Sequence, residues 1–164
     1  MILNVPKEAE SPMLKEVSRS LTLEEIKSAE IKEFTKDLIE TMYYKNGVGI
    51  ASVQVARPIA LCVIAKDFTP GKKADLVLIN PSFEKASILR DWDEEGCLSV
   101  PKIYGKVRRY KKIKVTALDV AGKKIQFIAS NFFARICQHE IDHLNGVLFN
   151  SKAKNLHGLE ENVL

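Results

Sequence analysis

The sequence predicts an α+β fold in which antiparallel and mixed β-sheets pack around a central buried helix, with an amphipathic helix near the N-terminus. Three observations support this class. Helical periodicity marks an early segment, short β-branched runs bounded by turn residues follow it, and a second helical segment comes late in the chain. The late helix is apolar on nearly every side, so we expect the sheets to cover it.

The early helix is predicted from a capping signal and an apolar stripe. Residues 22–25 read Thr-Leu-Glu-Glu, a capping box in which a hydroxyl and a carboxylate three residues apart satisfy the first turn. Apolar side chains then recur at roughly helical spacing as far as Tyr44, namely Ile26, Ile31, Phe34, Leu38 and Met42. We expect one amphipathic helix over this whole stretch.

Strands are predicted in the middle of the chain. The runs 61–65 and 76–80 are short, β-branched and bounded by turn residues, as is typical of buried strands. The segments 112–119 and 124–129 alternate partly between apolar and polar residues and flank a turn that contains Gly122. They predict an antiparallel hairpin with one solvated face.

The late helix carries the most informative segment. Ser130 can cap it, apolar residues continue as far as Leu144, and the glycine at 146 can end it after about four turns. The polar side chains that project from this helix are His139, Glu140 and His143. A buried helix can hold such side chains rigidly.

Length and composition limit the class of protein. The 164 residues predict one domain over 1–164, with a short polar tail from about residue 151 that could end in a turn or helix. The net charge of +4 favours anionic surroundings without demonstrating nucleic-acid binding. No signal peptide or membrane-length apolar run is present, so we expect a cytoplasmic protein with neither DNA nor membrane as partner. The cysteine count, three, disfavours a disulfide framework.

The segment His-Glu-Ile-Asp-His at 139–143 predicts a metal site. Residues four apart lie on one face of a helix, so His139 and His143 can bind one cation with Glu140 beside them. A divalent cation lowers the pKa of its water from about 16 towards about 7, and Glu140 can take that proton. The alternative is that two core histidines fall at this spacing by chance, which the helix signals around them disfavour.

A tetrahedral site that stays open to water needs a third protein ligand. The sequence offers several candidates, which are Asp142, His157, Cys62, Cys97 and Cys137. Asp142 lies about 100° around the helix from each histidine and is expected to face elsewhere. Cys62 and Cys137 fall in apolar surroundings and read as small core residues, and His157 follows a flexible polar stretch. Cys97, next to charged residues, could complete the site as a thiolate.

Three segments together resemble the peptide deformylase family, whose members remove the formyl group from the N-terminal methionine of nascent bacterial and organellar proteins. The family pattern G-x-G-[LI]-A-A-x-Q appears as GVGIASVQ at 47–54, E-G-C-L-S appears as EGCLS at 95–99, and Q-H-E-x-D-H appears as QHEIDH at 138–143. All three occur in family order. The resemblance covers about residues 1–150.

The resemblance implies a metal centre and a catalytic group. Cys97, His139 and His143 match the family's metal ligands, and Glu140 matches its acid/base residue, which activates the water at the metal. The implied cofactor is one Fe2+ per chain, with Zn2+, Ni2+ or Co2+ able to replace it. The implied function is metal-dependent hydrolysis of N-formylmethionyl polypeptides, with release of formate.

The resemblance also implies an oxyanion site and a substrate site. The side-chain amide of Gln54 and the backbone N–H of Leu98 match the two donors to the developing oxyanion. Read without the family, Gln54 is a polar loop residue and the glycines of the first motif belong to a turn. The implied substrate-binding residues are Gly47, Val48, Gly49, Gly96 and Leu98.

The chain departs from the family pattern in three places. Ser52 replaces the second alanine of the first motif, Lys102 stands where many members carry glycine, and the segment 7–12 looks expanded. The tail is short beside members whose long C-terminal helix docks on the ribosome, so the ribosome exit region is only a possible partner besides the formylated peptide. The basic run 108–112 reads as a solvated strand edge; the alternatives are contact with ribosomal RNA, or Arg109 near substrate.

Two other functions compete with deformylation. A zinc endopeptidase shares the His-Glu-x-x-His arrangement, but a cysteine ligand upstream and the two further motifs disfavour it. A non-catalytic, ribosome-associated module would be expected to have lost a ligand or the glutamate, and all of them are present.

Overall fold

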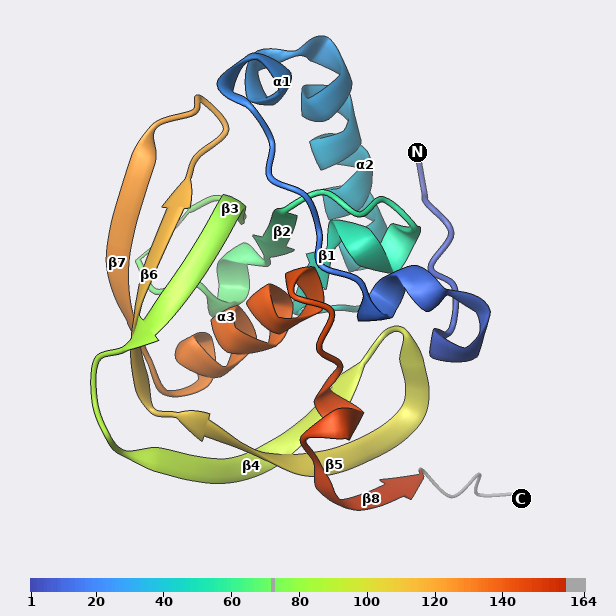
Figure 1. The fold of residues 1–164 in the computed structure, drawn as a ribbon, viewed down its shortest axis with the longest axis vertical. Helices are drawn as coiled ribbons and strands as arrows, with labels where there is room; N and C mark the ends of the chain where they lie inside the picture. Colours follow the sequence, from blue (N-terminus) through green and yellow to red (C-terminus); the bar gives the residue numbers. More distant parts are fainter. Residues whose placement is uncertain (72, 159–164) are drawn as a thin grey trace.

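Two antiparallel β-sheets and three α-helices make up residues 1–71 and 73–158, which the computed structural model describes (Figure 1). The helices are α1 (Leu23–Lys27), α2 (Ala29–Tyr44) and α3 (Asn131–Leu144). The strands are β1 (Gly49–Ala51), β2 (Leu61–Ile64), β3 (Leu76–Lys85), β4 (Arg90–Cys97), β5 (Val100–Tyr110), β6 (Lys112–Leu118), β7 (Lys124–Ser130) and β8 (Lys154–Gly158). Short 3₁₀ turns occur at Glu8–Glu10, Pro12–Lys15, Ser52–Val55, Lys66–Phe68 and Phe149–Ser151.

The predicted α+β class and antiparallel sheets are confirmed. One sheet has the strand order β1-β2-β3-β6-β7 and the other the order β4-β5-β8. Every ladder within these sheets is antiparallel, and parallel pairing occurs among the described residues only as an isolated bridge between Arg19 and Ile59. The expected mixed sheet is therefore not found in this part of the chain.

The central helix α3 lies between the two sheets (Figure 1). Its side chains Ile136, Cys137 and Ile141 are buried and share one apolar core with Val115 of β6. Helix α3 contacts strands of both sheets, including β1, β2 and β5. More polar side chains of α3 are buried than the sequence indicated, since Arg135, Gln138 and Asp142 are buried as well.

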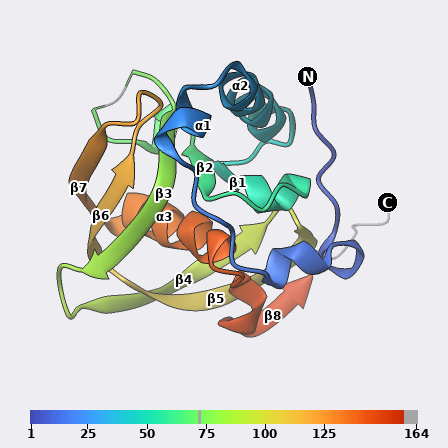
Figure 2. The ribbon, with the colours of Figure 1, turned by 45° about the horizontal axis from the view of Figure 1, so that its top comes forward.

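Strands β1 and β2 lie between α2 and α3 (Figure 2). All four residues of β2 are buried, and they alternate between two cores. Leu61 and Val63 pack with the apolar stripe of α2, whereas Cys62 and Ile64 pack with α3. Burial on both faces explains why β2 is continuously apolar in sequence.

The predicted single helix over residues 23–44 is wrong at one position. The capping box at Thr22 and Glu25 is present, but α1 ends after Lys27, and α2 begins after Ser28. The backbone of Ser28 is extended. The Ser28 hydroxyl donates to the carbonyl of Glu25 at 2.6 Å and accepts from Ile31 N–H at 3.2 Å. A serine side chain that bonds to nearby backbone groups competes with the helix ladder, so the chain bends here.

The hairpin predicted from residues 112–129 is confirmed, because β6 and β7 pair antiparallel from Lys112 with Ser130 to Leu118 with Lys124. Helix α3 follows it at once. Ser130 occupies the N-cap position but its side chain makes no capping bond, so that part of the prediction is wrong. Gly146, with φ of 73°, takes the left-handed conformation expected of a residue that ends a helix.

Other elements were not predicted, or were predicted differently. Strand β3 runs beyond residue 80 to Lys85, and β4 and β5 form the long hairpin whose turn carries the second motif. Part of the tail pairs with β5 as strand β8, where a turn or helix was expected. The last residues of that expected helix, 159–164, lie outside the described residues. None of the helices described has the length and apolar character needed to cross a membrane.

Candidate metal centre

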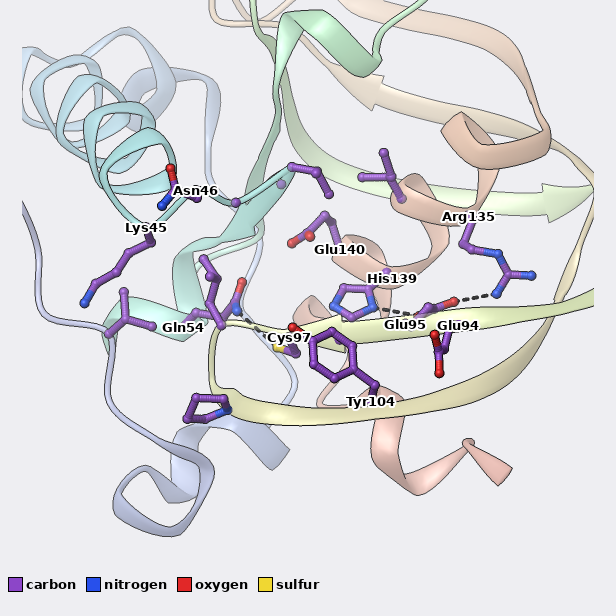
Figure 3. Close-up of a pocket in the computed structure, with 18 of the residues that line it drawn as sticks. Lys45, Asn46, Gln54, Glu94, Glu95, Cys97, Tyr104, Arg135, His139 and Glu140 are labelled. Atoms are coloured by element: carbon purple, nitrogen blue, oxygen red, sulfur yellow. Dashed lines mark hydrogen bonds and ion pairs between the residues drawn. The ribbon is translucent and has the colours of Figure 1, made fainter. Parts of the chain in front are cut away.

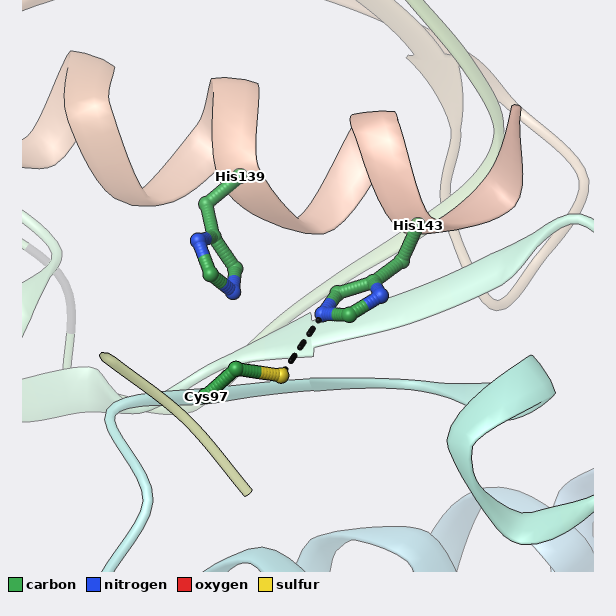
Figure 4. A group of neighbouring side chains, drawn as sticks. All are labelled: Cys97, His139 and His143. Atoms are coloured by element: carbon green, nitrogen blue, oxygen red, sulfur yellow. Dashed lines mark hydrogen bonds between the residues drawn. The ribbon is translucent and has the colours of Figure 1, made fainter. Parts of the chain in front are cut away.

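Three side chains from two distant parts of the chain bring a sulfur and two imidazole nitrogens together (Figure 4). His139 and His143 project from α3, and Cys97 ends β4. One ligand atom from each residue lies within 4.8 Å of the others, and Cys97 Sγ is 3.2 Å from His143 Nε2. A thiolate with two imidazoles is a donor set that fits a tetrahedral cation and leaves one position open.

The remaining candidates for the third ligand lie elsewhere. Asp142 pairs with Arg109 and Lys152 at 2.8 and 2.9 Å. Cys62 and Cys137 are free thiols in the apolar core, where burial raises the pKa of each, to about 12 for Cys137. His157 lies on the exposed strand β8, and its Nε2 is 2.8 Å from Glu94 Oε1.

The electrostatics of the cluster favour the thiolate. Burial opposes ionisation of Cys97, but the attraction of His143 and His139 outweighs it and holds the pKa of the thiol well below its usual value. Burial likewise opposes the charged form of His139, but bonds to Cys97 and Glu95 raise its pKa to about 10. Because an imidazole must be neutral to bind a cation, metal binding here would release a proton.

Glu95 orients His139 and was not identified from the sequence as a site residue. Its Oε1 is 2.8 Å from His139 Nδ1, which leaves Nε2 of that ring for a cation. The same carboxylate accepts from Arg109 Nε at 2.6 Å and Arg135 at 2.7 Å. Burial opposes its ionisation, but Arg109 and His139 lower the pKa of Glu95 well below its usual value. The sequence signal for it was its place as the first residue of the second motif, EGCLS at 95–99.

The expected solvated edge at residues 108–112 is wrong for Arg109, which is 4% exposed. Its guanidinium bridges Glu95 on the neighbouring strand and Asp142 on α3. Alternate residues of β5 face opposite sides of the sheet, so Arg108 is exposed while Arg109 is buried, and Lys111 is exposed in the bend that follows the strand. Arg109 therefore acts on the cluster through Glu95.

We predict that Glu95→Gln weakens both the fold and the metal site. Removing the charge leaves Arg109 and Arg135 buried without a full counter-charge, at a cost of about 3 kcal/mol or more. A neutral amide oxygen is a weaker acceptor for His139 Nδ1–H than the carboxylate, so metal binding should weaken by about 10- to 100-fold. Urea unfolding and metal titration measure the two effects. Exposed Glu94→Gln is the matched control, and equal losses in both variants would contradict this role of Glu95.

Glu140 lies beside His139 on α3 and is buried. Its Oε2 has no hydrogen-bond partner within the described residues. Burial raises the pKa of Glu140, against the attraction of His139 and His143. A Cβ on Gly49 would lie 2.7 Å from Glu140 Oε1 and 2.9 Å from Cγ, so a residue without a side chain is required there.

Gln54 presents its amide to the cluster. Its Oε1 accepts from Ala51 N–H at 2.8 Å, which turns Nε2 towards Cys97 Sγ at 3.4 Å and Ser99 Oγ at 3.3 Å. Leu98 is the first residue of the turn between β4 and β5, directly after Cys97. Both predicted oxyanion donors therefore come from residues next to the cluster.

Two departures from the family pattern differ in how well they suit the local structure. Ser52 is fully buried, and its hydroxyl donates to the carbonyl of Ile59. Lys102 has φ of 62°, in the left-handed region that glycine enters at least cost. Lysine is therefore more strained at position 102 than glycine, the residue of the family pattern, would be.

A pocket of about 700 Å³ opens beside the cluster (Figure 3). Most of the residues predicted for the site line it: Gly47, Val48, Gly49, Gln54, Gly96, Cys97, Leu98, His139 and Glu140. His143, the third member of the cluster, is 1% exposed and does not line the pocket. Sequence reasoning missed other lining residues, which include Tyr104, Phe132, Arg135 and Ile136. The Tyr104 ring packs on Gly96, where an added Cβ would lie 2.7 Å from it.

Comparisons with known proteins agree on one family. The model of the family described as polypeptide deformylase matches residues 2–158. The peptide deformylase of Brucella suis biovar 1 (strain 1330) is 41% identical over 140 residues, which cover 84% of this chain and 77% of that relative.

Solved structures give the same result. A Met-Ala-Ser-bound class I type b peptide deformylase from Acinetobacter baumannii is 34% identical, with a TM-score of 0.86 over 93% of this chain and 98% of that one. The peptide deformylase of Thermotoga maritima is 30% identical, with a TM-score of 0.85 over 94% of this chain and 99% of that one.

Proposed function

Because this chain belongs to the polypeptide deformylase family of hydrolases, we propose that it removes the formyl group from N-formylmethionyl nascent polypeptides and releases formate. The observation that carries the proposal is the convergence of Cys97, His139 and His143 beside Glu140, whose Oε2 is buried without a partner. The Acinetobacter relative binds Met-Ala-Ser, a peptide that begins with methionine as the product of this reaction would.

We propose that Cys97, His139 and His143 bind one Fe2+ per chain and that Zn2+, Ni2+ or Co2+ can replace it. Thiolate and imidazole donors suit several of these cations. A cation held there would polarise the formyl carbonyl and acidify a water molecule.

Glu140 then moves the protons of the reaction. Its Oε2 accepts the proton of the attacking water and passes it to the nitrogen of the leaving amine. The raised pKa of the carboxyl group suits it to both steps, because a group that accepts and returns a proton works best near the ambient pH.

The oxyanion that forms at the formyl carbon accepts hydrogen bonds from Gln54 Nε2 and from the backbone N–H of Leu98. The methionine side chain and the backbone of the substrate contact Gly47, Val48, Gly49, Gly96 and Leu98. The bond from Ala51 N–H fixes the Gln54 amide, so its donor is oriented before substrate arrives.

An anaerobic preparation with metal quantification tests this function. Formate release from formyl-Met-Ala, without cleavage of unformylated peptides, is the expected result. Cleavage of internal peptide bonds would favour the zinc endopeptidase, and absence of both activities in metal-loaded protein would exclude both functions. We further propose that residues 1–164 act as one catalytic domain in the cytoplasm; contact with the ribosome exit region stays a prediction from the sequence.

A further inference from the structure

The mouth of the pocket carries an excess of positive charge that the deformylation chemistry does not use. The exposed charged residues that line it are Lys7, Lys45, Lys102 and Glu94. Deeper in the pocket, Glu95 and Arg135 neutralise each other at 2.7 Å. Lys7 and Lys45 therefore bring two positive charges to the mouth, where Glu94 is the exposed carboxylate among the described lining residues.

Lys7 and Lys45 approach the mouth from separate elements. Lys7 comes from the N-terminal segment before the first 3₁₀ turn, and Lys45 follows the last residue of α2. Lys45 lies on the opposite side of Cys97 from Glu94 (Figure 3). Across the described residues neither Lys7 nor Lys45 forms an ion pair with a carboxylate, whereas Glu94 already has His157 as a partner.

We infer that Lys7 and Lys45 form a subsite that favours acidic side chains in the residues following formylmethionine; this inference rests on the proposed deformylase function. A formylated amine is an uncharged amide, so the charge of the substrate near the pocket comes only from its side chains. Once formylmethionine reaches Glu140, the rest of the polypeptide must leave through the mouth and pass these ammonium groups.

The expected preference is moderate and depends on salt. An exposed ion pair contributes little individually, so each lysine should change kcat/KM by about two- to fivefold. Salt screens exposed charges over about 10 Å at 0.1 M ionic strength and over about 3 Å at 1 M. The preference should therefore shrink as salt is added, unlike a preference set by the shape of the pocket.

Three C-terminally amidated peptides test the inference: formyl-Met-Ala-Xaa-Xaa-amide with Glu, Gln or Lys at both Xaa positions. At low ionic strength we expect kcat/KM to be about tenfold higher for the Glu peptide than for the Lys peptide, with the Gln peptide between them. Calorimetry with the deformylated peptides should give the same order of affinity, a readout independent of turnover.

The double substitution Lys7→Glu and Lys45→Glu should reverse the order of the Glu and Lys peptides. The double substitution Lys123→Glu and Lys124→Glu makes the same change in net charge at exposed residues outside the pocket and should leave the order unchanged. Equal turnover of the three peptides, or an order that the Lys7 and Lys45 changes leave intact, would overturn the subsite while deformylation stands. Failure to hydrolyse any formylated peptide would overturn both.

Discussion

Glu140→Gln is expected to lower kcat/KM for formyl-Met-Ala by about 10³-fold or more while the protein keeps its metal. The amide fills the same space but cannot accept the proton of the attacking water at Oε2. Proton transfer by a positioned side chain contributes about 10²–10⁴-fold to catalysis, so the loss should lie at the upper end of this range. Formate-release kinetics and metal analysis of the same preparation measure both properties.

The same substitution should not destabilise the fold. Glu140 is 4% exposed and its Oε2 has no partner among the described residues, so the neutral amide removes a charge that burial disfavours. Urea unfolding should show equal or higher stability, as expected when catalysis and stability place opposite demands on one residue. Glu24→Gln, the same change on the exposed face of α1, should alter neither property. Near-normal turnover in Glu140→Gln would exclude its role as acid/base.

The residues of the candidate site could be predicted from the sequence because their geometry is local. His139, Glu140 and His143 lie on one helix, and helical spacing alone places the two imidazoles side by side, with ring centroids 4.9 Å apart. Cys97 was different. The sequence offered five candidates for the third ligand, the surroundings of each favoured Cys97, and the family motif pointed to the same residue, which the structure places in the cluster.

What the sequence did not reveal depends on contacts between distant residues. Arg109 looked like part of an exposed basic run, but Glu95 and Asp142, which bury it, are 14 and 33 residues away. Strands β4 and β5 are charged on their exposed faces, so they lack the apolar pattern that identified β2. The break at Ser28 is local, yet serine also occurs within helices, and only the bonds of its hydroxyl show that the helix ends there.

Cys97→Ala is expected to weaken metal binding by more than about 100-fold, because changing an outer partner of a ligand already costs about 10- to 100-fold. The two histidines would remain on α3, but they supply too few protein ligands for a tetrahedral site and no negative charge to oppose that of the cation. Metal content should fall below one ion per chain, and deformylation should fall with it. The stabilisation that added metal confers on thermal unfolding should also disappear, since a ligand that binds only the native state raises its stability by mass action.

Cys137→Ala is the matched control for this variant. Like Cys97→Ala, it replaces a cysteine thiol with a methyl side chain. Cys137 lies on α3, two residues before His139, but it is buried in the apolar core. The variant should lose some stability from the cavity and keep its metal, its activity and its metal-dependent thermal shift. Retention of one tightly bound ion per chain in Cys97→Ala would exclude Cys97 as the third ligand. A residue other than Cys62, Cys137, Asp142 and His157 would then have to supply it, because these four lie outside the cluster in this structure. Addition of excess cation to Cys97→Ala separates the role of the thiol from that of the metal. Activity that returns at high cation concentration would show that Cys97 contributes only by raising the affinity for the metal.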